Sequence, residues 1–350
     1  MPSQAAWVVR HRASAQVARL RALDRFGENP GDLDAKIYVP KSATDRAPLV
    51  VVLHGCTQTA EDYDRGAAWT VAADRHGFVL LFPEQQRANN PNLCFNWFSP
   101  RDARRDRGEA LSIIQMVEAV RARHGTDPNR VFVTGLSAGG AMAMVLLATY
   151  PDVFAGGAII AGLPFATANN VPQALERMRG HDIPNAKRLG ELVASASNYS
   201  GPWPSLSVWH GSLDPTVAPT NARAIVDQWR MVQGASEAPC RADLVDCHPR
   251  YVWCDPTGRE VIEEIQVKGL GHGVPLSTRS PQSQEVAGPH MLEAGISSTS
   301  MILRFWGLTS SGGTTSATSP PDPSEEHPKR VPGEIASTIE NALRAAGLLR

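Results

Sequence analysis

The chain has 350 residues, of which 42% are hydrophobic and 20% charged, a composition typical of a folded globular protein. Its formal net charge of −1 creates no broad electrostatic field that would attract nucleic acid or an anionic membrane. No apolar run approaches the ~20 residues that a membrane-spanning helix needs. Neither nucleic acid nor a membrane is therefore an expected partner.

The first 34 residues are basic and loosely amphipathic. The spacing of Val17, Leu20 and Leu23 predicts a surface helix, which is followed by a loop at residues 29–31. The short apolar stretch near the start is interrupted by three basic residues at 10–12, so no secretory signal is recognised. Taken alone, this N-terminal sequence predicts a cytoplasmic protein, and the localisation is left open.

Residues 35–308 alternate between strand-like and helix-like segments and are expected to form one catalytic domain. Strands are expected at 35–39, 49–53, 78–82, 131–134, 156–161, 206–209 and 261–267, and crossover helices at 62–76 and 108–124. Such alternation predicts an α/β fold with a mostly parallel central sheet and helices on both faces.

Three segments depart from this alternation. Residues 163–204 suggest one or two helices and are interpreted as a small helical cap inserted over the site. Residues 309–332 are rich in Ser, Thr, Gly and Pro, which predicts a flexible linker. Residues 333–350 predict a C-terminal helix that is short for autonomous stability, so it is expected to dock on the body or to mediate oligomerisation.

The most informative stretch is the G-x-S-x-G motif at residues 135–139. An apolar, β-branched run at 131–133 precedes it and a helix-forming segment at 141–149 follows it. Side chains at 135 and 139 would collide with neighbouring backbone, and the sharp turn forces strained backbone angles on Ser137. This context predicts that Ser137 is a nucleophile exposed at the carboxyl end of a sheet. The alternative is an ordinary glycine-rich turn.

A nucleophilic serine needs a base and a carboxylate that orients the base, in the chain order Ser, Asp, His on this fold. Asp214 follows the strand-like run at 206–209, and His272 stands on a glycine-flanked loop after the run at 261–267. Both lie at strand ends, where the triad partners are expected. Asp214 precedes Pro215, so it is alternatively the start of a turn. His210 is expected to be structural beside Asp214.

The negative charge that develops on a substrate oxygen requires preorganised donors. One is expected to be the backbone N–H of Ala138, at the start of the helix after Ser137. The apolar run at 49–53 ends in His54-Gly55-Cys56, so the backbone N–H of Cys56 is the second expected donor. An aromatic-rich segment at 95–98 contains Trp97 beside Asn96. These two residues are candidate substrate-binding residues, although such aromatics are equally expected in a core.

Six ordered segments resemble the poly(3-hydroxybutyrate) depolymerase family of esterases, within the α/β-hydrolases. They are LHGCTQTAEDYD (53–64), CFNWF (94–98), GLSAGGAMA (135–143), HGSLDPTV (210–217), GLGHGVPL (269–276) and MLEAGISSTSMILRFWGL (291–308). The resemblance implies an α/β-hydrolase fold and a Ser137, Asp214, His272 triad. Many relatives carry a GHAW-type sequence after the base, where this chain has GHGVPL (271–276), and many relatives are extracellular.

The five cysteines leave their pairing open. Cys56 and Cys94 lie in segments that carry the resemblance, and they are either bridged, closing the oxyanion loop onto residues 94–98, or two buried thiols. Cys240, Cys247 and Cys254 recur every seven residues, whereas a metal site favours closer pairs and more ligands. No metal and no cofactor are expected.

The leading hypothesis is a serine esterase that acts through an acyl-enzyme on hydroxyalkanoate polymers, their oligomers or short-chain esters. One alternative is a feruloyl or acetylxylan esterase that acts on plant cell-wall esters, because fold alone does not select the substrate. Another is a non-catalytic α/β-hydrolase relative that binds a ligand or partner. Such a protein usually lacks a triad member, and all three candidates are present here.

Overall fold

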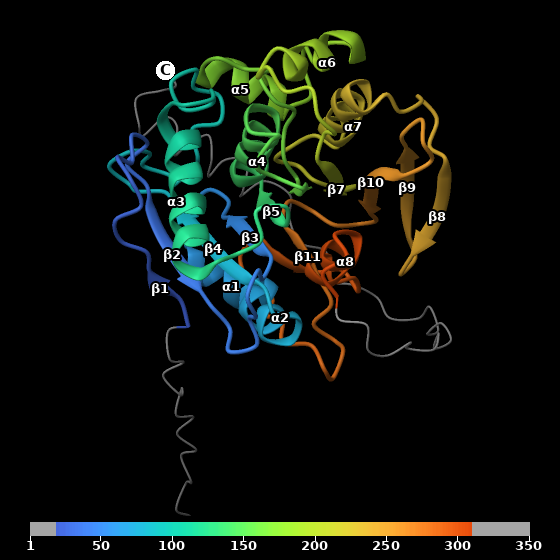
Figure 1. Ribbon diagram of the computed structural model, residues 1–350. Helices are drawn as coiled ribbons and strands as arrows, with labels where there is room; N and C mark the ends of the chain where they lie inside the picture. Colours follow the sequence, from blue (N-terminus) through green and yellow to red (C-terminus); the bar gives the residue numbers. More distant parts are fainter. Residues whose placement is uncertain (1–18, 310–350) are drawn as a thin grey trace, which may run out of the picture.

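The computed structural model describes residues 19–309, which form an α/β fold around one large sheet (Figure 1). The ten strands of this sheet lie in the order β1-β2-β4-β3-β5-β6-β7-β10-β9-β8. In chain order, the strands are β1 (Arg21–Ala22), β2 (Asp34–Tyr38), β3 (Leu49–Leu53), β4 (Val79–Glu84), β5 (Val131–Leu136), β6 (Gly156–Ile160), β7 (Ser205–Gly211), β8 (Arg241–Val245), β9 (His248–Cys254) and β10 (Glu260–Val267). A separate parallel pair contains β11 (Val274–Leu276) and β12 (Met291–Glu293).

The centre of the large sheet is parallel and its two ends are antiparallel. The neighbours from β4 through β3, β5, β6 and β7 to β10 all pair in parallel. The pairs β1–β2, β2–β4, β10–β9 and β9–β8 are antiparallel. The helices are α1 (Ala60–Ala67), α2 (Trp69–His76), α3 (Gly108–His124), α4 (Ala138–Thr149), α5 (Val171–Met178), α6 (Ala186–Ala194), α7 (Thr220–Gln233) and α8 (Ser298–Phe305). The predicted α/β-hydrolase fold, with a mostly parallel sheet, is confirmed.

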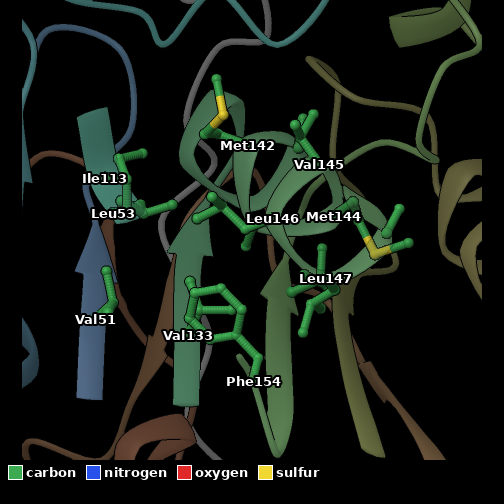
Figure 2. Packing of buried hydrophobic residues seen from close by; sticks show 14 of the residues in the cluster. Val51, Leu53, Ile113, Val133, Met142, Met144, Val145, Leu146, Leu147 and Phe154 are labelled. Carbon is green, nitrogen blue, oxygen red and sulfur yellow. The ribbon is translucent and has the colours of Figure 1, made fainter. Parts of the chain in front are cut away.

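The core is split by the sheet into two layers. Along β3, Leu49, Val51 and Leu53 belong to the cluster that contains α3 and α4, whereas Val50 and Val52 belong to the cluster with α1, α2 and α8. Figure 2 shows the first layer, where side chains of α4 pack over β3 and β5. A strand buried on both faces therefore reads as a continuous apolar run, which is why β3 was predictable.

Two local predictions differ from the structure. The helix expected over residues 62–76 is two helices, because Ala68 adopts a left-handed conformation (φ 55°) between α1 and α2. The Asp64 carboxylate accepts the backbone N–H and hydroxyl of Thr70, which caps the first turn of α2 and fixes the break. The described part of the predicted N-terminal helix contains strand β1 instead, with Leu20 and Leu23 buried beside the sheet.

The region 163–204 contains α5 and α6, as two helices. Helix α6 packs along α7, and both α5 and α6 lie at the top of the view in Figure 1. A cap function for this region stays a prediction. The predicted linker and C-terminal helix lie outside the described residues, apart from position 309. None of the helices between residues 19 and 309 combines the length and apolar character needed to span a membrane.

Candidate active site

Ser137 occupies a strained position at the carboxyl end of β5. Its backbone has φ 56° and ψ −117°, in a region that non-glycine residues rarely adopt, and it forms the N-cap of α4. Its N–H donates to the Ile160 carbonyl at 2.9 Å, so the turn is anchored to the neighbouring strand β6. Strain of this kind persists only where the surroundings enforce it, and it is concentrated at functional sites.

The glycines of the motif permit two close backbone approaches. A Cβ atom on Gly139 would lie 2.4 Å from the Leu53 carbonyl oxygen and 2.5 Å from that of His54. A Cβ atom on Gly135 would lie 2.4 Å from the Gly139 carbonyl carbon. The start of α4 therefore packs directly on the end of β3, which places Ala138 beside the loop that begins at His54.

Asp214 and His272 meet in a buried hydrogen bond. His272 Nδ1 lies 2.7 Å from one carboxylate oxygen of Asp214, and the other oxygen accepts the backbone N–H groups of Thr216 and Val217 at 2.8 and 2.9 Å. Asp214 thus also organises its own turn, as the alternative reading proposed. Although burial favours the neutral acid, the His210 ring, whose Nε2 lies 3.4 Å from the carboxylate, and the hydrogen bond from His272 hold the pKa of the Asp214 carboxyl well below its usual range. The residue is therefore a carboxylate that orients His272.

Sheet topology brings these three side chains to the same edge. Ser137, Asp214 and His272 follow β5, β7 and β10, whose carboxyl ends point the same way. The loop after β10 folds back across the end of β7, since a Cβ atom on Gly211 would lie 2.4 Å from the Leu270 carbonyl oxygen. His272 is thereby displaced from β10 toward β5. Within residues 19–309, the Ser137 hydroxyl makes no hydrogen bond to His272, and such contacts are often loose without substrate.

His54 fixes the loop that carries the expected second oxyanion donor. Its Nε2 accepts the Gln85 backbone N–H at 3.1 Å, so Nδ1 carries the proton and donates to the Gly55 carbonyl at 2.8 Å. Burial lowers the pKa of His54, which favours this neutral form. Because the peptide is trans, the N–H of Cys56 points away from the His54 ring. In the described part of the chain, neither backbone nor side chains accept a hydrogen bond from this N–H.

A disulfide joins the same loop to a second segment. Cys56 and Cys94 are bridged, which resolves the alternative between a disulfide and two thiols. The Thr57 N–H donates to the Asn92 carbonyl at 2.7 Å, so the two segments are also joined by backbone. A second disulfide links Cys240 to Cys254, a pairing that the sequence analysis did not propose, and Cys247 is free and exposed.

Comparison with known proteins places the chain in a family. A family model described as Esterase PHB depolymerase matches residues 33–243. The chain is 42% identical over 298 residues to poly(3-hydroxyalkanoate) depolymerase C of Paucimonas lemoignei, covering 85% of this chain and 72% of that protein. The chain belongs to the esterase PHB depolymerase family. It is therefore an ester hydrolase, and the predicted family resemblance is confirmed.

More distant relatives also match the chain, one in sequence and one in structure. Feruloyl esterase B of Talaromyces stipitatus is 31% identical over 267 residues, covering 74% of this chain and 73% of that protein. A solved acetyl xylan esterase from Aspergillus awamori superposes with a TM-score of 0.71 at 24% identity, covering 83% of this chain and 99% of that chain. This last likeness supports the α/β-hydrolase fold alone.

In this PHB depolymerase family member, Asn96 and Trp97 are engaged within the protein. The Asn96 side chain donates to Glu109 at 2.7 Å and accepts from Asn90 at 3.0 Å. Trp97 is 6% exposed and belongs to the hydrophobic core. The structure thus gives both residues structural contacts, and a substrate-binding role for them stays a prediction.

Sequence reasoning missed the residue that organises this segment, Glu109. It is fully buried in the first turn of α3 and accepts hydrogen bonds from the Asn96 backbone N–H at 2.8 Å and from the Gln85 side chain at 2.7 Å. Burial raises the pKa of Glu109 to about 8, although these hydrogen bonds act to lower the pKa. Gln85 also donates to the Cys94 carbonyl at 3.1 Å. A glutamate at a helix start ordinarily signals only a favourable charge, so no sequence signal marked it.

Proposed function

We propose that the protein hydrolyses carboxylic esters through a covalent acyl-enzyme formed on Ser137, and that its natural substrates are 3-hydroxyalkanoate polymers, their oligomers or related short esters. The observation that supports this most strongly is the 2.7 Å hydrogen bond between buried Asp214 and His272, on the sheet edge where Ser137 adopts its strained conformation. The substrate class is supported by the 42% identity to a poly(3-hydroxyalkanoate) depolymerase.

In the first half of the reaction, Ser137 Oγ attacks the ester carbonyl carbon while its proton passes to His272 Nε2. The carbonyl oxygen becomes an oxyanion held by the backbone N–H groups of Cys56 and Ala138. When the intermediate collapses, the bond to the alcohol breaks and His272 gives its proton to the leaving oxygen. Asp214 remains ionised throughout and stabilises the imidazolium, as its lowered pKa favours.

In the second half, water replaces the alcohol. His272 takes a proton from the water as the water attacks the acyl-enzyme carbonyl, and the same two N–H groups hold the second oxyanion. Collapse breaks the bond to Ser137 Oγ, which recovers its proton from His272, and a carboxylic acid is released. The sequence of steps uses only groups of this chain and water.

The test is Ser137→Ala with p-nitrophenyl butyrate. The variant should show no burst of p-nitrophenol, and its kcat should fall by roughly 10⁴-fold or more. The loss is not total, because an enzyme that lacks one triad member still accelerates the reaction roughly 10³–10⁴-fold over water. Ser236→Ala, at an exposed loop serine, is the matched control and should retain wild-type kinetics. Circular dichroism confirms that both variants fold. Wild-type turnover in folded Ser137→Ala would contradict the proposal.

A panel of substrates tests the substrate class separately. The proposal predicts the highest kcat/KM on 3-hydroxybutyrate oligomers, compared with methyl ferulate and acetylated xylan. A clear preference for either plant ester would replace the hydroxyalkanoate assignment, since relatives named feruloyl esterase and acetylxylan esterase also match the chain. The serine mechanism would stand in that case.

A further inference from the structure

His210 lies near the carboxyl end of β7 and is almost completely buried. Its ring Nε2 lies 2.8 Å from the Val217 carbonyl oxygen and 3.4 Å from one carboxylate oxygen of Asp214. A carbonyl oxygen only accepts hydrogen bonds, so Nε2 carries a proton and donates a hydrogen bond to Val217. The ring therefore joins the strand to the turn that follows Asp214.

Val217 links His210 to Asp214. Its carbonyl oxygen accepts from His210, whereas its N–H donates to Asp214 Oδ1 at 2.9 Å, beside the Thr216 N–H at 2.8 Å. The other carboxylate oxygen, Oδ2, lies 2.7 Å from His272 Nδ1. A displacement of Val217 would move an N–H group that holds the carboxylate, and the hydrogen bond between Asp214 and His272 would lose its alignment.

The second ring nitrogen of His210 has no such contact. Nδ1 is buried, and no backbone or side-chain group of residues 19–309 forms a hydrogen bond with it. In the buried rings of His54 and His248, by contrast, both nitrogens are bonded. A buried polar atom without a partner costs free energy, so packing alone would favour an apolar side chain here. The bonded nitrogen, Nε2, must then account for the histidine.

We propose that His210 is a positioning residue for the proposed triad, because through the Val217 carbonyl it holds the turn at residues 214–217 and keeps Asp214 Oδ2 aligned with His272 Nδ1. The inference rests on the proposed function. His210 acts through Val217 and Asp214, and it exchanges no proton with the substrate. Its loss should therefore slow the chemical steps and leave substrate binding unchanged.

The experiment compares variants of the full-length protein with p-nitrophenyl butyrate as substrate. His210→Leu keeps a buried side chain of similar size and removes the donor. His210→Gln is the conservative variant, because its amide nitrogen is as many bonds from the backbone as the histidine Nε2 and can donate to Val217. Val208→Ala is the matched control, since Val208 is a fully buried, apolar residue on the same face of β7.

The kinetic readout is the separation of kcat from KM. His210→Leu should lower kcat roughly ten- to a hundredfold, the effect of a misplaced reacting group, and should leave KM within about twofold of wild type. His210→Gln should restore most of the lost kcat. Val208→Ala creates a cavity in the core, so it should lower the melting temperature and leave kcat unchanged.

A spectroscopic readout reports the hydrogen bond between Asp214 and His272 itself. The proton on His272 Nδ1 is held by a carboxylate oxygen 2.7 Å away, so wild type should show it as a far-downfield proton resonance. The resonance should move upfield or broaden in His210→Leu, return in His210→Gln and stay in place in Val208→Ala. A purely structural role of His210 would change the melting temperature and leave the resonance unmoved.

A fourth variant covers the case in which His210→Leu does not fold. The amide of His210→Asn is shorter by one bond and does not reach the Val217 carbonyl, so this variant should lose kcat where His210→Gln retains it. Equal kcat values and equal resonances in the asparagine and glutamine variants would contradict the positioning role.

The outcomes separate the two proposals. Wild-type kcat and an unmoved resonance in folded His210→Leu would overturn the positioning role and leave the serine esterase assignment intact. An equal loss of kcat in Val208→Ala would show a general effect of destabilisation and would also overturn it. Wild-type turnover in Ser137→Ala would remove the proposed function itself, whatever the His210 variants show.

Discussion

Two turns build the proposed site, and different interactions hold them in place. The turn at residues 135–140 is fixed by its own backbone, through glycines that allow close approach and through the anchor from Ser137 to β6. The loop at residues 54–58 is held by contacts with distant segments: the Gln85 backbone N–H donates to the His54 ring, and Cys56 forms a disulfide with Cys94. Glu109 in turn accepts a hydrogen bond from the Gln85 side chain.

This difference implies different responses to mutation. Damage to the first turn is expected to prevent folding, because the start of α4 and the end of β3 share that space. Damage to the supports of the second loop is expected to leave the fold in place and to reduce stability and the alignment of the Cys56 N–H. The following three predictions test this contrast.

The largest effect is expected for Gly139→Val. Its side chain would overlap the carbonyl oxygens of Leu53 and His54, so α4 would not close on β3. We expect a loss of at least about 3 kcal/mol in the free energy of unfolding, or no soluble protein. Gly271→Ala is the control, because nothing lies within 4 Å of a Cβ atom at that position. Thermal unfolding measures both, and a stable Gly139→Val protein would contradict the close-packed turn.

An intermediate effect is expected on removal of the Cys56–Cys94 disulfide. The double variant Cys56→Ser with Cys94→Ser opens a loop with a sequence separation of 38, which corresponds to about 3–4 kcal/mol of unfolding free energy. Its kcat on p-nitrophenyl butyrate should also fall. Complete loss of one oxyanion donor typically lowers kcat roughly 10²–10³-fold, and a misaligned donor should cause part of that loss.

The Cys240–Cys254 disulfide provides the comparison for that experiment. Its removal should destabilise the protein by about 3 kcal/mol, with a sequence separation of 14, and should leave kcat unchanged. Urea unfolding and steady-state kinetics distinguish the two variants. Equal effects on kcat would show that the first disulfide has no special relation to the oxyanion loop.

The smallest effect is expected for Glu109→Gln. Both oxygens of Glu109 now accept hydrogen bonds from Asn96, whereas an amide nitrogen is a donor and accepts none. The variant would therefore place a donor against a donor, which should reduce the free energy of unfolding by about 1–3 kcal/mol. Glu118→Gln, at an exposed position of the same helix, should change it by less than about 0.5 kcal/mol. A larger loss at Glu118 would contradict the assigned role of Glu109.

The difference in unfolding free energy between wild type and Glu109→Gln should depend on pH with a defined sign. The pKa of Glu109, about 8 in the folded protein, lies above that of an unfolded glutamate, about 4.3. The native state therefore binds a proton that the unfolded chain releases, and the contribution of Glu109 to stability fades as pH rises from about 4 to 8. Urea unfolding at several pH values should show the difference between wild type and Glu109→Gln shrinking in that window. A difference that grows with pH would contradict the assignment.

Sequence predicted most of what depends on local pattern. The strands of the parallel centre were visible as apolar runs, and Ser137, Asp214 and His272 were proposed as a triad because each follows such a run, a role that stays a prediction. The break at Ala68 was not predicted, since it depends on a capping hydrogen bond that the Thr70 N–H donates to Asp64, which no periodicity reveals. His54 and Glu109 were missed as supports because their partner, Gln85, is brought to them by tertiary packing, at sequence separations of 31 and 24 residues.

The most direct test of the central claim is covalent labelling with a fluorophosphonate probe, followed by mass spectrometry of the proteolytic peptides. The account predicts one label on wild-type protein, located on Ser137, none on Ser137→Ala, and labelling slowed by roughly 10³–10⁴ in Asp214→Asn, where His272 loses its orienting carboxylate. A label on another residue, or an active enzyme whose Ser137 stays unmodified, would contradict it.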